Sequence, residues 1–64
     1  MVWRLTLNDG TGLLIVADST FVEDGDQVFE IAVGDRPPTL IEIARLPTDS
    51  IASLHSEPTT ARDD

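Results

Sequence analysis

Acidic side chains crowd the stretch FVEDGDQVFE, residues 21–30, where carboxylates could bind a cation. These acids are Glu23, Asp24, Asp26 and Glu30. A calcium loop of the EF-hand type needs oxygen ligands at positions 1, 3 and 5, glycine at 6 and glutamate at 12. With Gly25 at position 6, the residues at positions 1, 3 and 12 are Thr20, Val22 and Ile31. The EF-hand pattern therefore fails.

The same Asp-Gly pair lies between two apolar stretches, which is typical of a hairpin turn. We therefore expect Asp24 and Gly25 to form a hairpin tip and the acids around them to be surface charge. Weak binding of a divalent cation by Glu23, Asp24 and Asp26 is the minor alternative, because hard cations want six or more oxygen ligands. We therefore expect no metal site.

The single histidine lies near the residue types of a hydrolytic triad. These are Asp49, Ser50, Ser53 and His55, all within seven residues of one another. A triad needs its three groups held in fixed geometry, usually in a pocket, and a chain of 64 residues has little volume for one. The stretch NDGTG, residues 8–12, also lacks both glycine-rich phosphate-binding patterns. We expect no catalytic residue, no cofactor and no enzymatic activity.

The charge balance restricts the partners. Twelve acidic residues face four arginines and no lysine, so the formal net charge is −8. Nucleic acid and anionic membranes should repel such a chain, because both are bound through basic side chains. A basic partner would be attracted. Acidity of this kind is also a proteome-wide habit of some organisms, and this simpler explanation is favoured.

Neither a disulfide nor a leader is expected. The chain has no cysteine, and its longest apolar run, LLIVA at residues 13–17, is far shorter than the roughly 20 residues of a membrane-spanning helix. No basic segment precedes a long apolar run at the N-terminus, as a signal peptide would require. The sequence predicts a soluble, cytoplasmic protein.

Alternating apolar residues and turn signals predict an all-β fold. The expected strands are 2–8, 12–22, 27–34, 39–46 and 51–55. A short 3₁₀ turn is expected over 47–50, with a C-terminal helix of one or two turns as the alternative reading of PTDSIASL. Residues 1–55 should form one small β domain, followed by a flexible acidic tail at 56–64.

The strand number and lengths resemble those of small SH3-like or Sm-like barrels. Four strands are joined mostly by short turns, and a tight turn then leads to a short fifth strand. The expected fold is therefore four to five short antiparallel strands in a curled meander or a small SH3-like barrel. The resemblance includes no family motif, so it implies no binding residues.

The apolar surplus is the most informative feature for function. Several strands are apolar on both faces, and large exposed apolar patches mark interaction sites. The candidate interface residues are Trp3, Leu14, Val16, Arg36 and Leu40. Trp3 alternates with Leu5 and Leu7, so packing in the core is the favoured reading for it. For Arg36, a loose pair with Asp35 in solvent is favoured over a binding role.

Three functions compete. A non-enzymatic β module that acts through protein contacts, above all as a homo-oligomer, leads. An acidic inhibitor or nucleic-acid mimic from a mobile element is second, but it predicts carboxylates in a row, and the acids here are spread over the turns. A small nucleic-acid-binding barrel is weakest, since it needs a basic face and only Arg4, Arg36 and Arg45 could supply one.

Overall fold

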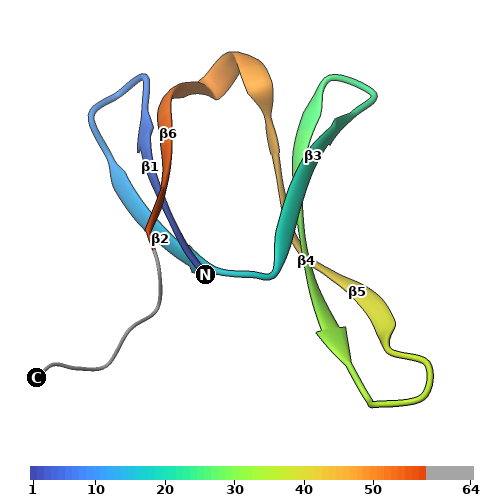
Figure 1. The fold of residues 1–64 in the computed structure, drawn as a ribbon. Helices are drawn as coiled ribbons and strands as arrows, with labels where there is room; N and C mark the ends of the chain where they lie inside the picture. Colours follow the sequence, from blue (N-terminus) through green and yellow to red (C-terminus); the bar gives the residue numbers. More distant parts are fainter. Residues whose placement is uncertain (58–64) are drawn as a thin grey trace, which may run out of the picture.

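The computed structural model describes residues 1–57, which form six antiparallel strands and one 3₁₀ turn (Figure 1). The elements in chain order are β1 (Val2–Leu7), β2 (Gly12–Val16), β3 (Ser19–Glu23), β4 (Asp26–Val33), β5 (Thr39–Pro47), η1 (Thr48–Ser50) and β6 (Ile51–Glu57). They build two three-stranded sheets, with strand orders β2-β1-β6 and β3-β4-β5. The all-β prediction is confirmed, with six strands rather than four or five.

Two tight hairpins are formed at Asp-Gly pairs, one at Asp9 and Gly10 and the other at Asp24 and Gly25, where it was predicted. At the tip of β3–β4, Asp24 has φ 53° and Gly25 has φ 81°. Two successive positive φ values are the mark of a type I′ turn, whose twist suits antiparallel strands and which glycine enters without a Cβ clash. The β1–β2 turn closes with the amide of Gly10 donating to the carbonyl of Leu7 at 2.9 Å. EDGD is therefore a hairpin tip.

The predicted strand 12–22 is wrong as a single strand, because the chain changes sheet at Ala17 and Asp18. The amide of Ala17 donates to the carbonyl of Met1, and that of Asp18 donates to the carbonyl of Glu30 at 2.8 Å. The carboxylate of Asp18 also accepts the amide of Ala32 at 2.6 Å. These hydrogen bonds divide the predicted strand, so that β2 belongs to one sheet and β3 to the other.

The predicted SH3-like barrel is also a misreading, since the two sheets of residues 1–57 stay open. The chain passes between them at residues 17–18 and again through η1, and the strands on either side of each passage belong to different sheets (Figure 1). Closing a barrel needs a continuous hydrogen-bonded ladder around the ring. Here β2, β3, β5 and β6 are all edge strands.

The core lies where the inner faces of the two sheets meet. Leu5, Ala17 and Phe29 are fully or almost fully buried in one cluster. Trp3 packs edge-on against Phe29, with ring centroids 6.3 Å apart, and its indole N–H donates to the carbonyl of Ala17 at 3.2 Å. Val28 is equally buried but lies on the other face of β4, since neighbouring strand residues point to opposite faces.

A β-bulge divides the β4–β5 hairpin. Phe29 pairs with Ala44 and Glu30 with Glu42, so Ile43 has no partner in the register. Beyond the bulge, the end of the hairpin extends away from the body formed by the two sheets (Figure 1). The radius of gyration of 13.0 Å exceeds the roughly 10–11 Å of a compact chain of this size, in keeping with that extension.

The C-terminal part follows the preferred reading. The 3₁₀ turn covers Thr48–Ser50, within one residue of the predicted 47–50, and β6 replaces the alternative helix. The amide of Thr48 donates to the carbonyl of Gly25 at 2.9 Å, which ties this turn to the β3–β4 tip. Because β6 runs to Glu57, the strand is longer than predicted; the rest of the predicted tail, 58–64, lies outside the described residues. No described helix is long and apolar enough to cross a membrane.

Candidate functional site

Exposed apolar side chains are the main candidate for a working surface. Only four hydrophobic residues of the described part are buried, namely Leu5, Ala17, Val28 and Phe29. Nine large hydrophobic residues are exposed: Met1, Leu14, Val16, Phe21, Val22, Val33, Leu40, Ile41 and Ile43. Single exposed apolar residues are normal, but neighbouring ones on the same strands mark surfaces that bind other molecules.

The first exposed group lies on the outer face of β2. Leu14 and Val16 point away from the core and are 61% and 62% exposed. Their cross-strand partners on β1 are Arg4 and Val2. Arg4 forms an ion pair with Glu57 of β6 at 3.2 Å, so charged groups border this small apolar patch on one side.

The second group lies on the part of the β4–β5 hairpin beyond the bulge. We call residues 32–43 the arm. It carries Val33, Leu40, Ile41 and Ile43 as exposed apolar side chains, and all five residues from Thr39 to Ile43 are exposed. Gly34, with φ 85°, begins the connection, in which the peptide bond between Arg36 and Pro37 is cis.

The five predicted interface residues are therefore not on one surface. Leu14 and Val16 share the outer face of β2, whereas Arg36 and Leu40 belong to the arm. Trp3 packs against the core, as its alternation with Leu5 and Leu7 predicted. Ile41 and Ile43 were not among these candidates. The bulge that leaves Ile43 unpaired has no signal in the sequence, although both residues belong to a strand that reads as apolar on both faces.

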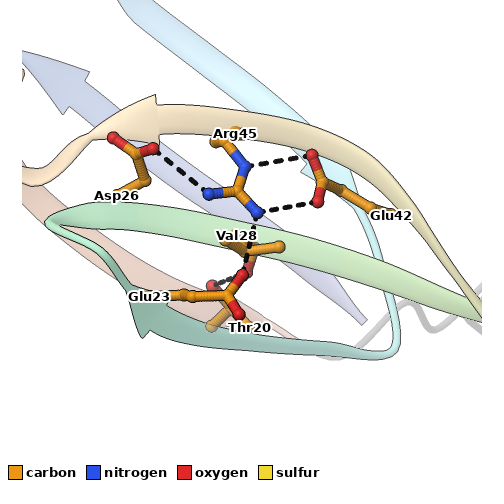
Figure 2. Close-up of polar contacts among 6 residues, drawn as sticks. All are labelled: Thr20, Glu23, Asp26, Val28, Glu42 and Arg45. Atoms are coloured by element: carbon orange, nitrogen blue, oxygen red, sulfur yellow. Dashed lines mark hydrogen bonds and ion pairs between the residues drawn. The ribbon is translucent and has the colours of Figure 1, made fainter.

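Two acids of the opening stretch, Glu23 and Asp26, are paired with Arg45. Figure 2 shows Arg45 of β5 lying over Val28, with carboxylates from all three strands of its sheet around the guanidinium. Its nitrogens lie 2.9 Å from Glu23, 3.2 Å from Asp26 and 3.0 Å from Glu42. We call these four residues the Arg45 cluster. With one positive and three negative groups, its formal charge is 1 − 3 = −2.

The Arg45 cluster explains why Val28 is buried on an outer face. Arg45 is the cross-strand partner of Val28 on β5, and Phe21 is its partner on β3. Arginine covers apolar surface with its aliphatic stem while its charged head stays at the water boundary. The aliphatic stem of Arg45 and the ring of Phe21 therefore shield Val28, and the carboxylates hold the guanidinium in place.

Two carboxyl groups have shifted pKa values. The hydrogen bond from Arg45 lowers the pKa of Glu42 below its ordinary value of 4.5, and Glu42 in turn is the main cause that raises the pKa of Arg45. The pKa of Asp9 is lowered by its hydrogen bonds with Thr11, whose amide donates to Oδ1 at 2.8 Å. Both groups are in solvent-exposed turns or faces, so these shifts reflect local bonding rather than a reactive site.

The residues that suggested a triad do not converge on a pocket. His55 lies at an exposed position of the edge strand β6, opposite Arg4 of β1. Ser50 belongs to η1, where its hydroxyl donates to the carbonyl of Pro47 at 2.7 Å. Across residues 1–57 the structure contains no pocket and no group of three potential metal ligands.

We expect acid to weaken the fold partly through Glu42. A carboxyl whose folded pKa is lowered adds stability above its unfolded pKa, and this stability is lost as the pH falls through 4.5 and below. Arg45→Met keeps an apolar cover over Val28 but removes the cation, so its unfolding free energy should fall less between pH 6 and pH 3 than that of the native chain. Urea unfolding over this pH range measures the difference.

Arg4→Met is the matched control for this experiment. Arg4 makes one exposed ion pair, with Glu57, and pairs of that kind contribute little to stability. Its pH dependence should therefore follow that of the native chain. An Arg45→Met variant with an unchanged pH profile would contradict the role assigned to the Arg45 cluster.

The fold and these surfaces define a class: a small all-β protein of two open three-stranded sheets, with an apolar arm. Comparison with protein families, with curated proteins and with solved structures finds no match.

Proposed function

We propose that this chain is a small acidic, non-enzymatic β module that acts through protein–protein contacts, foremost by self-association. The observation that supports the proposal is that, among the described residues, more large hydrophobic side chains are exposed than hydrophobic side chains are buried. Four hydrophobic residues are buried and nine large ones are exposed. A domain of this size is near the lower limit for folding alone, and oligomerisation is a common way to add buried apolar surface.

The shape of the arm supports the same proposal. A two-stranded hairpin is only marginally stable in water, because it buries little surface on its own. Past Ala32, whose amide is held by Asp18, β4 has no described neighbour other than β5. A contact with another molecule would cover the apolar residues of the arm and stabilise its strands.

The acidic mimic of nucleic acid is the second candidate and has less support. It needs rows of unpaired carboxylates at a spacing like that of phosphates. Glu23, Asp26 and Glu42 do gather on one face, but each is bonded to Arg45. Self-association is therefore the function that the described residues favour.

We expect the protein to be a dimer or larger assembly at micromolar concentration. Because association adds free energy only to the folded state, the midpoint of thermal unfolding should also rise with protein concentration. Multi-angle light scattering and sedimentation, at about 0.15 M salt to screen the charge of −8, measure the mass. A mass of 7.0 kDa that persists at high micromolar concentration would contradict the proposal.

A further inference from the structure

The free edge of β5 is the part of the arm that most needs a partner. β5 is the longest strand, with nine residues, and it pairs with β4 alone among the described strands. We infer that two copies of the chain join by antiparallel pairing of their β5 edges across a two-fold axis. This inference rests on the proposed self-association and names the surface that makes it.

The other three edges of the two sheets are less suited to pairing. β2 and β3 have five residues each, and β3 ends at Glu23, which is bonded to Arg45. β6 has only polar residues after Leu54, and its Glu57 is bonded to Arg4. Short, polar or charged edges are the usual protection against unwanted pairing. Between Thr39 and Ile43, β5 has no such protection apart from Glu42.

Two features limit the stretch that can pair. Pro37 and Pro38 lack an amide hydrogen, so a ladder cannot extend through them. The bulge at Ile43 bends the strand and interrupts its pattern of hydrogen bonds. The usable window is therefore Thr39–Ile43, whose midpoint is Ile41. An edge that pairs with its own copy over a window with one midpoint must place the two-fold axis there.

This register also avoids a clash of like charges. With the axis at Ile41, residue 40 of one copy lies opposite residue 42 of the other. Leu40 then faces the partner's Glu42, and the two glutamates stay apart. A shift of the axis by one residue to Glu42 would place the two carboxylates directly opposite each other, which is destabilising. The charge of Glu42 thus disfavours the register centred on Glu42, in keeping with the window centred on Ile41.

Charge complementarity extends the contact beyond the window. Arg36 lies in the connection that precedes β5, so in the paired copies it lies toward the partner's residues that follow Ile43. The partner's Arg45 cluster, of formal charge −2, lies in that direction. Arg36 has no ion pair within residues 1–57. Each copy would thus offer one cation to the excess negative charge of the other, despite a net charge of −8 per chain.

The outcome is a continuous sheet of six strands, ordered β3-β4-β5 and then β5-β4-β3 of the second copy. The free backbone groups of both edges gain partners, and Ile41 packs against the partner's Ile41. Because sheets are built from ladders of this kind, no change of fold is needed in either copy.

Cysteine cross-linking tests the register, since the native chain has no cysteine. Residues directly opposite in an antiparallel pair have Cα atoms about 4.5–5.5 Å apart, within the range of a disulfide. Ile41→Cys should therefore form a covalent dimer under mild oxidation with diamide. In Ile43→Cys the two cysteines would be roughly 14 Å apart along the paired strands, beyond that range. We expect at least tenfold slower cross-linking of Ile43→Cys, measured on non-reducing gels.

A charge on the edge tests the surface itself. Leu40→Glu places a carboxylate directly opposite the partner's Glu42, and this pair of like charges should raise the dimer dissociation constant at least tenfold. Leu14→Glu is the matched control, because Leu14 and Leu40 are 61% and 58% exposed. It should keep the native mass in light scattering, and circular dichroism should show both variants folded.

The outcomes separate the two proposals. A monomeric native chain would overturn self-association and with it the pairing of β5. A native dimer that survives Leu40→Glu but is lost in Leu14→Glu would overturn the β5 edge alone and point to the outer face of β2. Equal cross-linking of Ile41→Cys and Ile43→Cys would also overturn the register, while leaving self-association intact.

Discussion

Phe29→Ala is expected to unfold the protein. Phe29 is completely buried and joins the two sheets through Leu5, Ala17 and the edge-on contact with Trp3. Truncating a buried phenylalanine costs about 3–5 kcal/mol. A chain of this length has a total stability of roughly 3–10 kcal/mol at the common value per residue. The loss is therefore comparable with the whole free energy of unfolding of the protein.

The single tryptophan reports this unfolding directly, because Trp3 lies against Phe29 and its emission should shift when water reaches it. Phe21→Ala is the matched control. Phe21 is 39% exposed and covers Val28 from the outer face, so its truncation should cost roughly 1–2 kcal/mol and leave the chain folded. If urea titration showed Phe29→Ala to be as stable as Phe21→Ala, Phe29 would not be the residue that holds the two sheets together.

Trp3→Ala is expected to have the second largest effect and to lower the free energy of unfolding by about 3 kcal/mol. This value is at the lower end of the range for a core aromatic residue, because Trp3 is only half-buried. The substitution removes the packing against Phe29. It also removes the indole N–H that satisfies the carbonyl of Ala17, a residue that is almost fully buried. Circular dichroism during urea unfolding measures the change, since the fluorescent side chain is gone.

Trp3→Phe separates the two contributions. It keeps an aromatic ring next to Phe29 but leaves the carbonyl of Ala17 without its donor, which should cost roughly 1–3 kcal/mol. The dimer dissociation constant of folded Trp3→Phe should match that of the native chain, because Trp3 lies inside the core and away from β5. A folded but monomeric Trp3→Phe would instead assign Trp3 to the interface.

Local chemistry explains which predictions were confirmed. The tips at Gly10 and Gly25 follow from Asp-Gly pairs that accept positive φ, and the strands between them follow from alternation. The end of β5 and the 3₁₀ turn follow from Pro47 and the polar residues after it. Each of these features depends on side chains only a few residues apart, so the sequence displays all of them.

The errors occurred where distant segments meet. The stretch LLIVADSTFV reads as one strand with a bend or bulge at Asp18-Ser19-Thr20, but Asp18 bonds to Glu30 and Ala32 and turns the chain into the second sheet. The closed barrel was the natural expectation for strands apolar on both faces. The structure instead buries one face of each sheet and leaves much of the remaining apolar surface exposed on β2 and the arm.

The candidate surfaces divide in the same way. The surplus of apolar residues, and with it the expectation of self-association, is visible in the composition of the strands. The sequence does not reveal which of those residues share a surface, because Leu14 and Leu40 belong to different sheets. The role of Arg45 is equally hidden, since its partners Glu23 and Asp26 lie 22 and 19 residues away.

The sequence by itself therefore determined the all-β class, the two hairpin tips and the acidic, apolar-rich character of the chain. These properties arise from backbone preferences and periodicity within a few residues. Only the tertiary structure decided the crossing at Asp18, the bulge at Ile43, the cover of Val28 by Arg45 and the free edge of β5. Each of these depends on which strands become neighbours, and that choice is made by burial summed over the whole chain.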